Sequence, residues 1–152
     1  MSLPPVIAGS PQEKTDGEQL QLLAIFHFIY AGMGVFGILF LFVHHGIMTH
    51  LMTDPRMRQD YHGNLPPEQL IHWFDWFYVF MGLYFVVSMV LNVGSGLFLR
   101  QRSHRLFSQV TAGLNCLHFP FGTALGVFTF IVLSRDSVRT LYAEARQSAN
   151  FL

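Results

Sequence analysis

The sequence predicts an all-α integral membrane protein with four transmembrane helices, the last two forming a short hairpin at Pro120. Hydrophobic residues make up 51% of the 152 residues and charged residues only 12%, whereas about a quarter of the residues in a soluble domain are charged. The mean hydropathy is +0.38. Long apolar runs over residues 20–43, 71–99 and 106–133 alternate with polar segments, as expected for helices that cross a bilayer.

The composition also excludes several classes of protein. Nine basic and nine acidic residues give a net charge of zero, so the chain has no basic field for nucleic acid. Cys116 is the only cysteine in the sequence, which excludes an intrachain disulfide and a cysteine-rich metal site. The length fits one domain of ordinary size.

We expect three regions along the chain. Residues 1–19 are polar and contain Pro and Gly, and they lack the basic start and apolar core of a signal peptide. This segment is predicted to be a polar N-terminal tail. A single helical transmembrane domain is expected over residues 20–142, followed by a C-terminal tail over residues 143–152.

The first apolar run, residues 20–43, is long enough for the roughly 20 helical residues that cross a bilayer. Gly32, Gly34 and Gly37 lie within it, and small residues let membrane helices approach each other closely. His27 is an ionisable group inside the run, and such groups are often functional. It is predicted to bond to Asn92 or Asn115, or to serve as a haem ligand or proton relay.

The second span is predicted over residues 71–99, after a polar connection over residues 47–69. Trp73, Trp76 and Tyr78 near its start are typical of an interfacial aromatic belt. Gly82 is a further candidate packing residue. The span ends in the basic segment of residues 100–105.

The third run, residues 106–133, contains Pro120 and allows two interpretations. It forms either one kinked helix, giving three spans, or a hairpin of two short helices, giving four. Lys and Arg are enriched on cytoplasmic flanks. A hairpin places the basic residues of segments 100–105 and 135–146 on one side, so we favour four spans with both termini in the cytoplasm. Gly122 and Gly126 form a small-xxx-small pair, and Thr123 can bond back to a carbonyl freed near Pro120.

The motif Pro120-x-Gly122-Thr123-x-Leu125-Gly126 resembles the ending of a group of small bacterial four-span membrane proteins without an assigned activity. The resemblance covers residues 94–142. It implies the four-span architecture and a location in the bacterial inner membrane, and it implies no active site. Beyond it, residues 135–142 have the helical spacing of an amphipathic segment on the membrane surface.

Eight histidines are the unusual chemical feature of the sequence. Imidazole binds Zn, Cu, Fe and haem iron. The four-span topology brings one group of residues to the outer membrane face as a candidate metal site: His44, His45, His72, Asp75 and His118. His27 and His72 are the candidate haem ligands. The alternative is that these histidines bond to water, headgroups or carbonyls at the interface.

Two functions follow as hypotheses. The first is a non-enzymatic structural or accessory subunit of a larger membrane complex, or a homo-oligomer, whose partners are the lipid bilayer and other subunits or copies of itself. The second is a histidine-ligated haem- or metal-binding protein for electron transfer or metal handling. A third, a small transporter, would use His27, Asn92 and Asn115 to line a path. No Ser-His-Asp set or phosphate-binding loop points to an enzyme.

Overall fold

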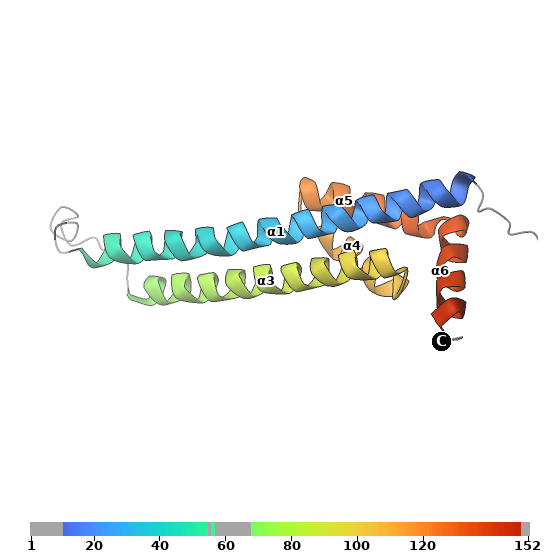
Figure 1. Cartoon of the computed structure of the whole chain (residues 1–152). Helices are drawn as coiled ribbons and strands as arrows, with labels where there is room; N and C mark the ends of the chain where they lie inside the picture. Colours follow the sequence, from blue (N-terminus) through green and yellow to red (C-terminus); the bar gives the residue numbers. More distant parts are fainter. Residues whose placement is uncertain (1–10, 55, 57–67, 150–152) are drawn as a thin grey trace, which may run out of the picture. The chain divides into compact units, whose positions relative to one another are not determined.

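The computed structural model describes residues 11–54, 56 and 68–149, without the side chains of residues 68–71 and 149. The prediction of an all-α protein is confirmed for this part of the chain. Its five helices are shown in Figure 1: α1 (Pro11–Thr53), α3 (Glu68–Gln101), α4 (Arg105–Asn115), α5 (Phe121–Ser134) and α6 (Asp136–Ala149).

Helices α1 and α3 are both long and apolar enough to cross a membrane. Helices α5 and α6 pass the same test as a pair, although they are bent by 73° at the break between them. The described residues thus hold two candidate spans, or three if the bent pair is one span. Helix α4 has 11 residues and rises only about 16 Å, so by length it does not add the fourth span expected from the sequence.

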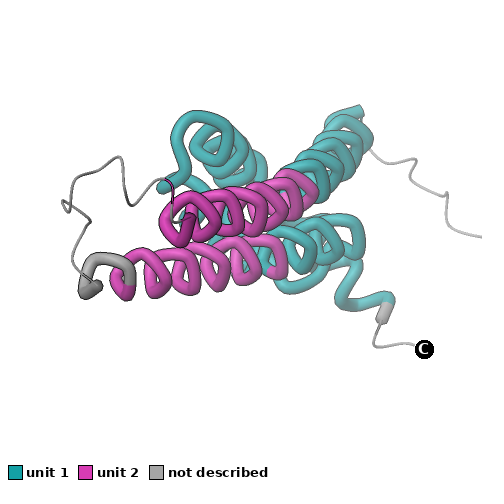
Figure 2. Tube along the Cα trace, turned by 90° about the vertical axis from the view of Figure 1, so that its left-hand side faces the viewer, with its two compact units in different colours: residues 1–30, 91–152 teal, residues 31–90 magenta. Residues whose placement is uncertain are grey.

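The structure divides into two compact units, coloured separately in Figure 2. Unit 1 holds the described residues up to Tyr30 and from Leu91 onward, and unit 2 holds Ala31–Val90. Helices α1 and α3 each run through both units.

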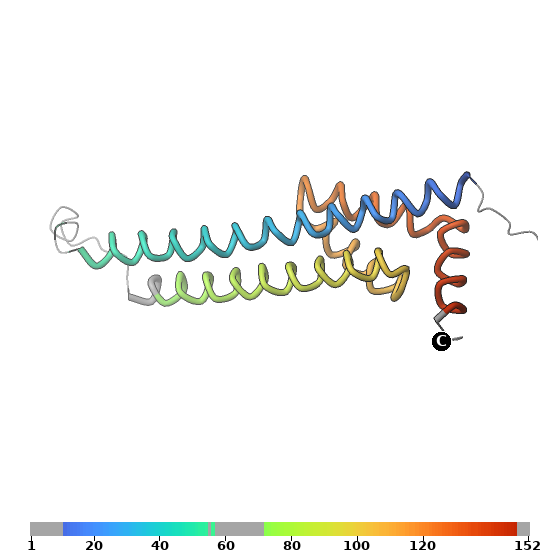
Figure 3. Tube along the Cα trace, in the orientation of Figure 1, coloured from blue at the N-terminus to red at the C-terminus, as the bar shows by residue number. Residues whose placement is uncertain are grey.

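In unit 1, α4 and α5 form the hairpin expected at Pro120, and the single kinked helix is not formed. A Cβ atom added at Gly126 would meet Ala112 O, and one added at Gly122 would lie 2.6 Å from Asn115 O. Contacts in this reversed order mean that the two helices are antiparallel. Figure 3 shows the chain reversing direction between them.

The first helix begins at Pro11, inside the segment expected to be a tail. Proline suits the first turn of a helix. Arg135 Nη1 donates to Asp16 Oδ1 (3.1 Å) and to Gln19 Oε1 (2.6 Å). Leu20 and Leu23 join the core one turn later. Tertiary contacts therefore order residues 11–19, whereas residues 1–10 of the predicted tail lie outside the described part.

Helix α6 confirms the amphipathic segment expected over residues 135–142 and extends it to Ala149. Val138 and Tyr142 are buried in the core of unit 1. Residues 143–149, which were expected to be part of the C-terminal tail, are helical. Residues 150–152 of that predicted tail are outside the described part.

The two basic segments lie at the same end of unit 1. Arg105 Nε donates to Leu133 O at 2.9 Å, which ties the start of α4 to the end of α5. A Cβ atom at Gly17, two turns into α1, would lie 3.0 Å from Arg102 Nη2. The start of α1 belongs to the same end, because Asp16 binds Arg135.

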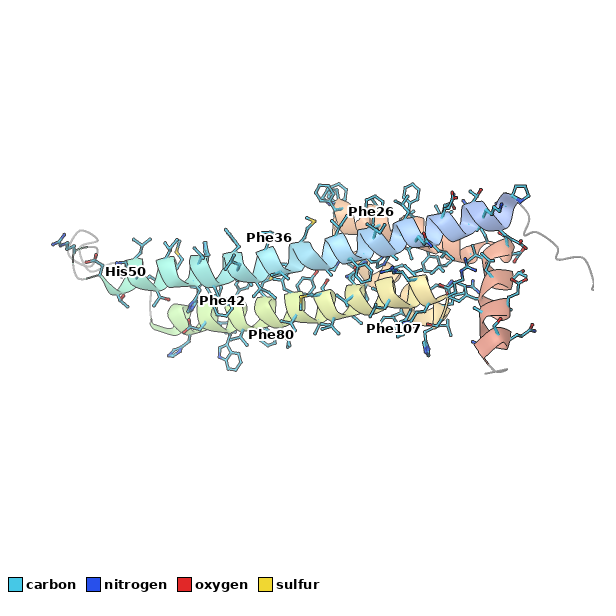
Figure 4. All side chains as sticks on the ribbon, viewed as in Figure 1. Phe26, Phe36, Phe42, His50, Phe80 and Phe107 are labelled. Atoms are coloured by element: carbon cyan, nitrogen blue, oxygen red, sulfur yellow. The ribbon has the colours of Figure 1, made fainter. Side chains whose placement is uncertain are left out.

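In unit 2, α1 and α3 form an antiparallel pair, seen side by side in Figure 2. Gly34 faces Met89 (3.6 Å from an added Cβ atom), and Gly37 faces the ring of Phe85 (2.7 Å). Large apolar side chains cover the outer surfaces of both helices. Phe36 and Phe80 are 73% and 66% exposed and point away from the pair (Figure 4).

Candidate functional site

A group of chemically active side chains lies in unit 2, between α1 and α3. His45 Nε2 donates to Asp75 Oδ1 at 3.1 Å. His44 Nδ1 and the Tyr78 hydroxyl are hydrogen-bonded at 2.6 Å. Asp75 and Tyr78 are three residues apart, so they share a face of α3. That face meets the successive histidines of α1.

Aromatic contacts reinforce this group, which we call the polar cluster: His44, His45, Asp75 and Tyr78. The His45 and Tyr78 rings meet edge to face with centroids 4.7 Å apart. The His44 and Tyr78 centroids are 5.9 Å apart. The Tyr78 ring therefore packs against both histidines.

A groove of about 510 Å³ runs from the polar cluster along the two helices of unit 2. Because α1 and α3 are antiparallel, one end holds His45 and Asp75, and the other holds Ile38 and Gly82. Its lining is apolar except at the cluster: Ile38, Leu41, Phe42, His45, Asp75, Tyr78, Val79 and Gly82.

The structure joins two of the five predicted metal ligands, His45 and Asp75. His44 turns to Tyr78 instead, His72 is exposed, and His118 belongs to unit 1. No three His, Cys, Asp or Glu side chains are grouped to hold a metal ion among the residues that the structure describes. Of the predicted haem ligands, His27 belongs to unit 1 and His72 to unit 2.

The buried polar side chains of unit 1 form hydrogen bonds to other partners than the expected ones. Asn115 Nδ2 donates to Asn92 Oδ1 (2.7 Å), and Asn92 Nδ2 donates to Asn115 Oδ1 (3.1 Å). Both predicted partners of His27 thus bond to each other. His27 Nδ1 donates to Leu23 O, one turn earlier in α1, at 3.0 Å. Within the described residues, His27 Nε2 is buried without a hydrogen-bond partner.

The hairpin corner is held by hydrogen bonds to backbone carbonyls. Thr123 Oγ1 donates to Cys116 O at 2.9 Å, and the Thr123 amide donates to His118 O at 3.0 Å. The first of these is the bond that the motif predicted for Thr123. Pro120 stands at the N-terminal end of α5, where the donor that it lacks is not needed by the helix.

The predicted packing glycines fall into two groups. Gly34, Gly37, Gly122 and Gly126 contact other elements of their own unit. Gly32 and Gly82 face open space as far as the described atoms extend, so a packing role for either would need another molecule.

Sequence reasoning missed the contacts of Asp16 and Gln19 with Arg135. Asp16 is fully buried, and its ion pair joins the start of α1 to the junction of α5 and α6. The sequence did contain a signal for a helix in this segment. The three- and four-residue spacing of one helix face is found in Asp16, Gln19, Leu20 and Leu23. That periodicity continues the first apolar run back into the predicted tail.

No protein-family model matches the chain, and no curated protein or solved structure shows significant similarity to it. The resemblance to small bacterial four-span proteins therefore stays a prediction from the motif at Pro120.

Proposed function

We propose that this chain is a non-catalytic membrane protein that acts by lateral packing, as an accessory subunit of a larger membrane complex or as a homo-oligomer. The observation that carries the proposal is the open face at Gly32. No described atom lies within 4 Å of a Cβ atom added there, and large apolar side chains flank the glycine.

These flanking side chains make Gly32 a notch in an otherwise bulky helix surface. Val35 and Phe36, three and four residues after it, are 53% and 73% exposed. Membrane helices associate through van der Waals packing and close backbone approach at small residues. A neighbouring helix can fill such a notch with a side chain.

The two long candidate spans leave much surface for a partner. Within the apolar windows of the candidate spans, 22% of α1 and 6% of α3 is buried. The internal polar groups support a packing role as well, since Asn92 bonds to Asn115 and Asp16 bonds to Arg135 inside unit 1. We infer that the outer apolar surface faces both lipid and protein neighbours.

The topology that accompanies this proposal has four membrane segments, with α4 and α5 as a short hairpin and both termini in the cytoplasm. It is supported by the shared location of Arg105, the end of α5 and the start of α1 at one end of unit 1. Basic residues are retained on the cytoplasmic side. The resemblance of the motif at Pro120 to bacterial four-span proteins supports a location in the bacterial inner membrane.

Native mass spectrometry of the protein extracted from its own membranes in mild detergent tests the packing role. We expect added mass equal to whole protein subunits. Added copies of this chain identify a homo-oligomer, and a different mass identifies a larger complex. A bare monomer would contradict the proposal.

Gly32→Leu is the matching variant, because it fills the notch without meeting any described atom of the chain. We expect it to lower the fraction of associated protein about tenfold, the effect of 1.4 kcal/mol on an association constant. Met33→Leu is the control, since Met33 is 49% exposed on the same helix and, as the next residue in the chain, does not share the face of Gly32.

A further inference from the structure

The groove in unit 2 is polar at one end and apolar at the other, which matches the shape of an amphiphilic molecule. Its polar end carries the His45–Asp75 pair, and its far end is formed by Ile38 and Gly82. Its volume of about 510 Å³ falls within the roughly 300–1,000 Å³ of small-molecule sites.

The polar end offers acceptor atoms. His45 Nε2 donates a hydrogen bond to Asp75 Oδ1. Asp75 Oδ2 can therefore accept a hydrogen bond from a ligand. The Tyr78 oxygen keeps a lone pair whichever partner donates in its bond to His44. The Asp75 side chain is 55% exposed, so a ligand in the groove can reach its carboxylate.

The charge at this end selects the sign of the ligand. Asp75 is an acid, and no Lys or Arg is among the described residues that line the groove. A phosphate or carboxylate headgroup would therefore meet an acid and no basic side chain there. Phe42 and Tyr78 also line the groove, and aromatic faces attract cations.

We propose that this groove binds a lipophilic amine, with its ammonium group on Asp75 and Tyr78 and its apolar body extending between α1 and α3 toward Gly82. An ammonium group has three donors and no acceptor, which matches the acceptor atoms of the polar end. Its attraction to a carboxylate is also stronger beside a bilayer than in bulk water.

Gly82 gives the groove its room at the apolar end. A Cβ atom added there meets no described atom within 4 Å, so the helix pair has room for a side chain at this position of the groove lining. Gly82→Leu is therefore the variant chosen to fill the apolar end of the site. Gly113→Leu is the matched control, since Gly113 is also open but is not part of the groove lining.

The test is photolabelling of the full chain in phospholipid nanodiscs with a dodecylamine that carries a diazirine on its chain. The matched probes are the corresponding dodecanol and dodecyl phosphate. Labelled peptides are mapped by mass spectrometry. We expect the amine to label residues 38–45 and 75–82 about tenfold more than the alcohol, the effect of one charge-assisted hydrogen bond.

Asp75→Asn should lower amine labelling to the level of the alcohol, because it keeps the size of the side chain and removes its charge. The fold should tolerate this change, since exposed ion pairs contribute little to stability. Gly82→Leu should abolish groove labelling by both probes, and Gly113→Leu should leave it unchanged. Circular dichroism of each variant verifies the helix content.

Three results would overturn the proposal: equal labelling by amine and alcohol, preferred labelling by the phosphate probe, or amine labelling that survives Asp75→Asn. The association measured for Gly32→Leu is a separate readout, so failure of the packing role is distinguishable from failure of this site.

Discussion

At the scale of single residues, close packing in unit 1 depends on the missing side chains of Gly122 and Gly126. A Cβ atom at Gly122 would lie 2.6 Å from Asn115 O and 2.7 Å from the Tyr30 hydroxyl. At Gly126 it would meet Ala112 O, and Cys116 Sγ at 2.7 Å. Because backbone atoms are involved at both positions, a side-chain rotation cannot relieve the contact.

Gly126→Ala is therefore expected to destabilise the protein by about 1–3 kcal/mol, as overpacking of a close contact does. Gly113→Ala, in α4, is the control, because an added Cβ atom there meets no described atom within 4 Å. It should raise stability by about 0.5–1 kcal/mol through the helix preference of alanine. The free energy of unfolding in detergent micelles measures both. Equal effects of the two substitutions would contradict a tight α4–α5 contact.

At the scale of elements, the apolar runs predicted where helices lie better than where they begin and end. Residues 20–43 correspond to the middle of α1, which extends by about three turns at each end. The extension at the N-terminal end depends on Asp16, Gln19 and their bonds to Arg135. A hydropathy pattern cannot contain that information, because the partner lies more than a hundred residues away in the chain.

Asp16→Ala is expected to cost about 1.5–3 kcal/mol, because it removes the charge-assisted hydrogen bond between the Arg135 guanidinium and a buried carboxylate. Glu18→Ala is the control with the same change of charge. Glu18 is exposed, so we expect a change within about 0.5 kcal/mol.

Amide hydrogen exchange of residues 11–19 gives a second measurement of the same contact. Exchange should accelerate in Asp16→Ala and stay at the wild-type rate in Glu18→Ala. If both variants matched the wild type in stability and exchange, the ion pair would not hold the start of α1 in place.

At the scale of the whole molecule, the predictions concern how many segments cross the membrane and on which side of it the termini and the hairpin corner lie. Helix α5 has 14 residues, which rise about 21 Å against a hydrocarbon core of roughly 30 Å. A four-segment topology therefore requires the hairpin to extend into the interface. A single span made of α5 and α6 would instead place the end of α6 on the outer face.

Cysteine labelling with a membrane-impermeant maleimide distinguishes these arrangements. In a Cys116→Ser background, single cysteines are placed at Gln12, Phe119 and Ser148, all of which are exposed. We expect Gln12→Cys and Ser148→Cys to react from the cytoplasmic side and Phe119→Cys from the outer side.

Right-side-out and inside-out vesicles give the two sides of this experiment. Labelling of Ser148→Cys from the outer side would support three spans and contradict the four-segment topology. Protection of Phe119→Cys on both sides would mean that the hairpin stops inside the bilayer, which also contradicts it.

The sequence by itself determined the class of the protein and its main helices. Long apolar runs and sparse charge leave α-helices as the structure that satisfies every backbone group in lipid, and the positions of Pro120, Gly122 and Gly126 indicated the hairpin between α4 and α5. These features are local, so they can be found from composition and spacing.

Only the tertiary structure decided which polar groups meet. It paired Asn92 with Asn115 and left His27 to a carbonyl of its own helix. It also joined His45 to Asp75 and opened a groove beside them. The physical reason is that hydrogen bonding depends on the relative rotation and offset of two helices, and neither helix sequence specifies these alone.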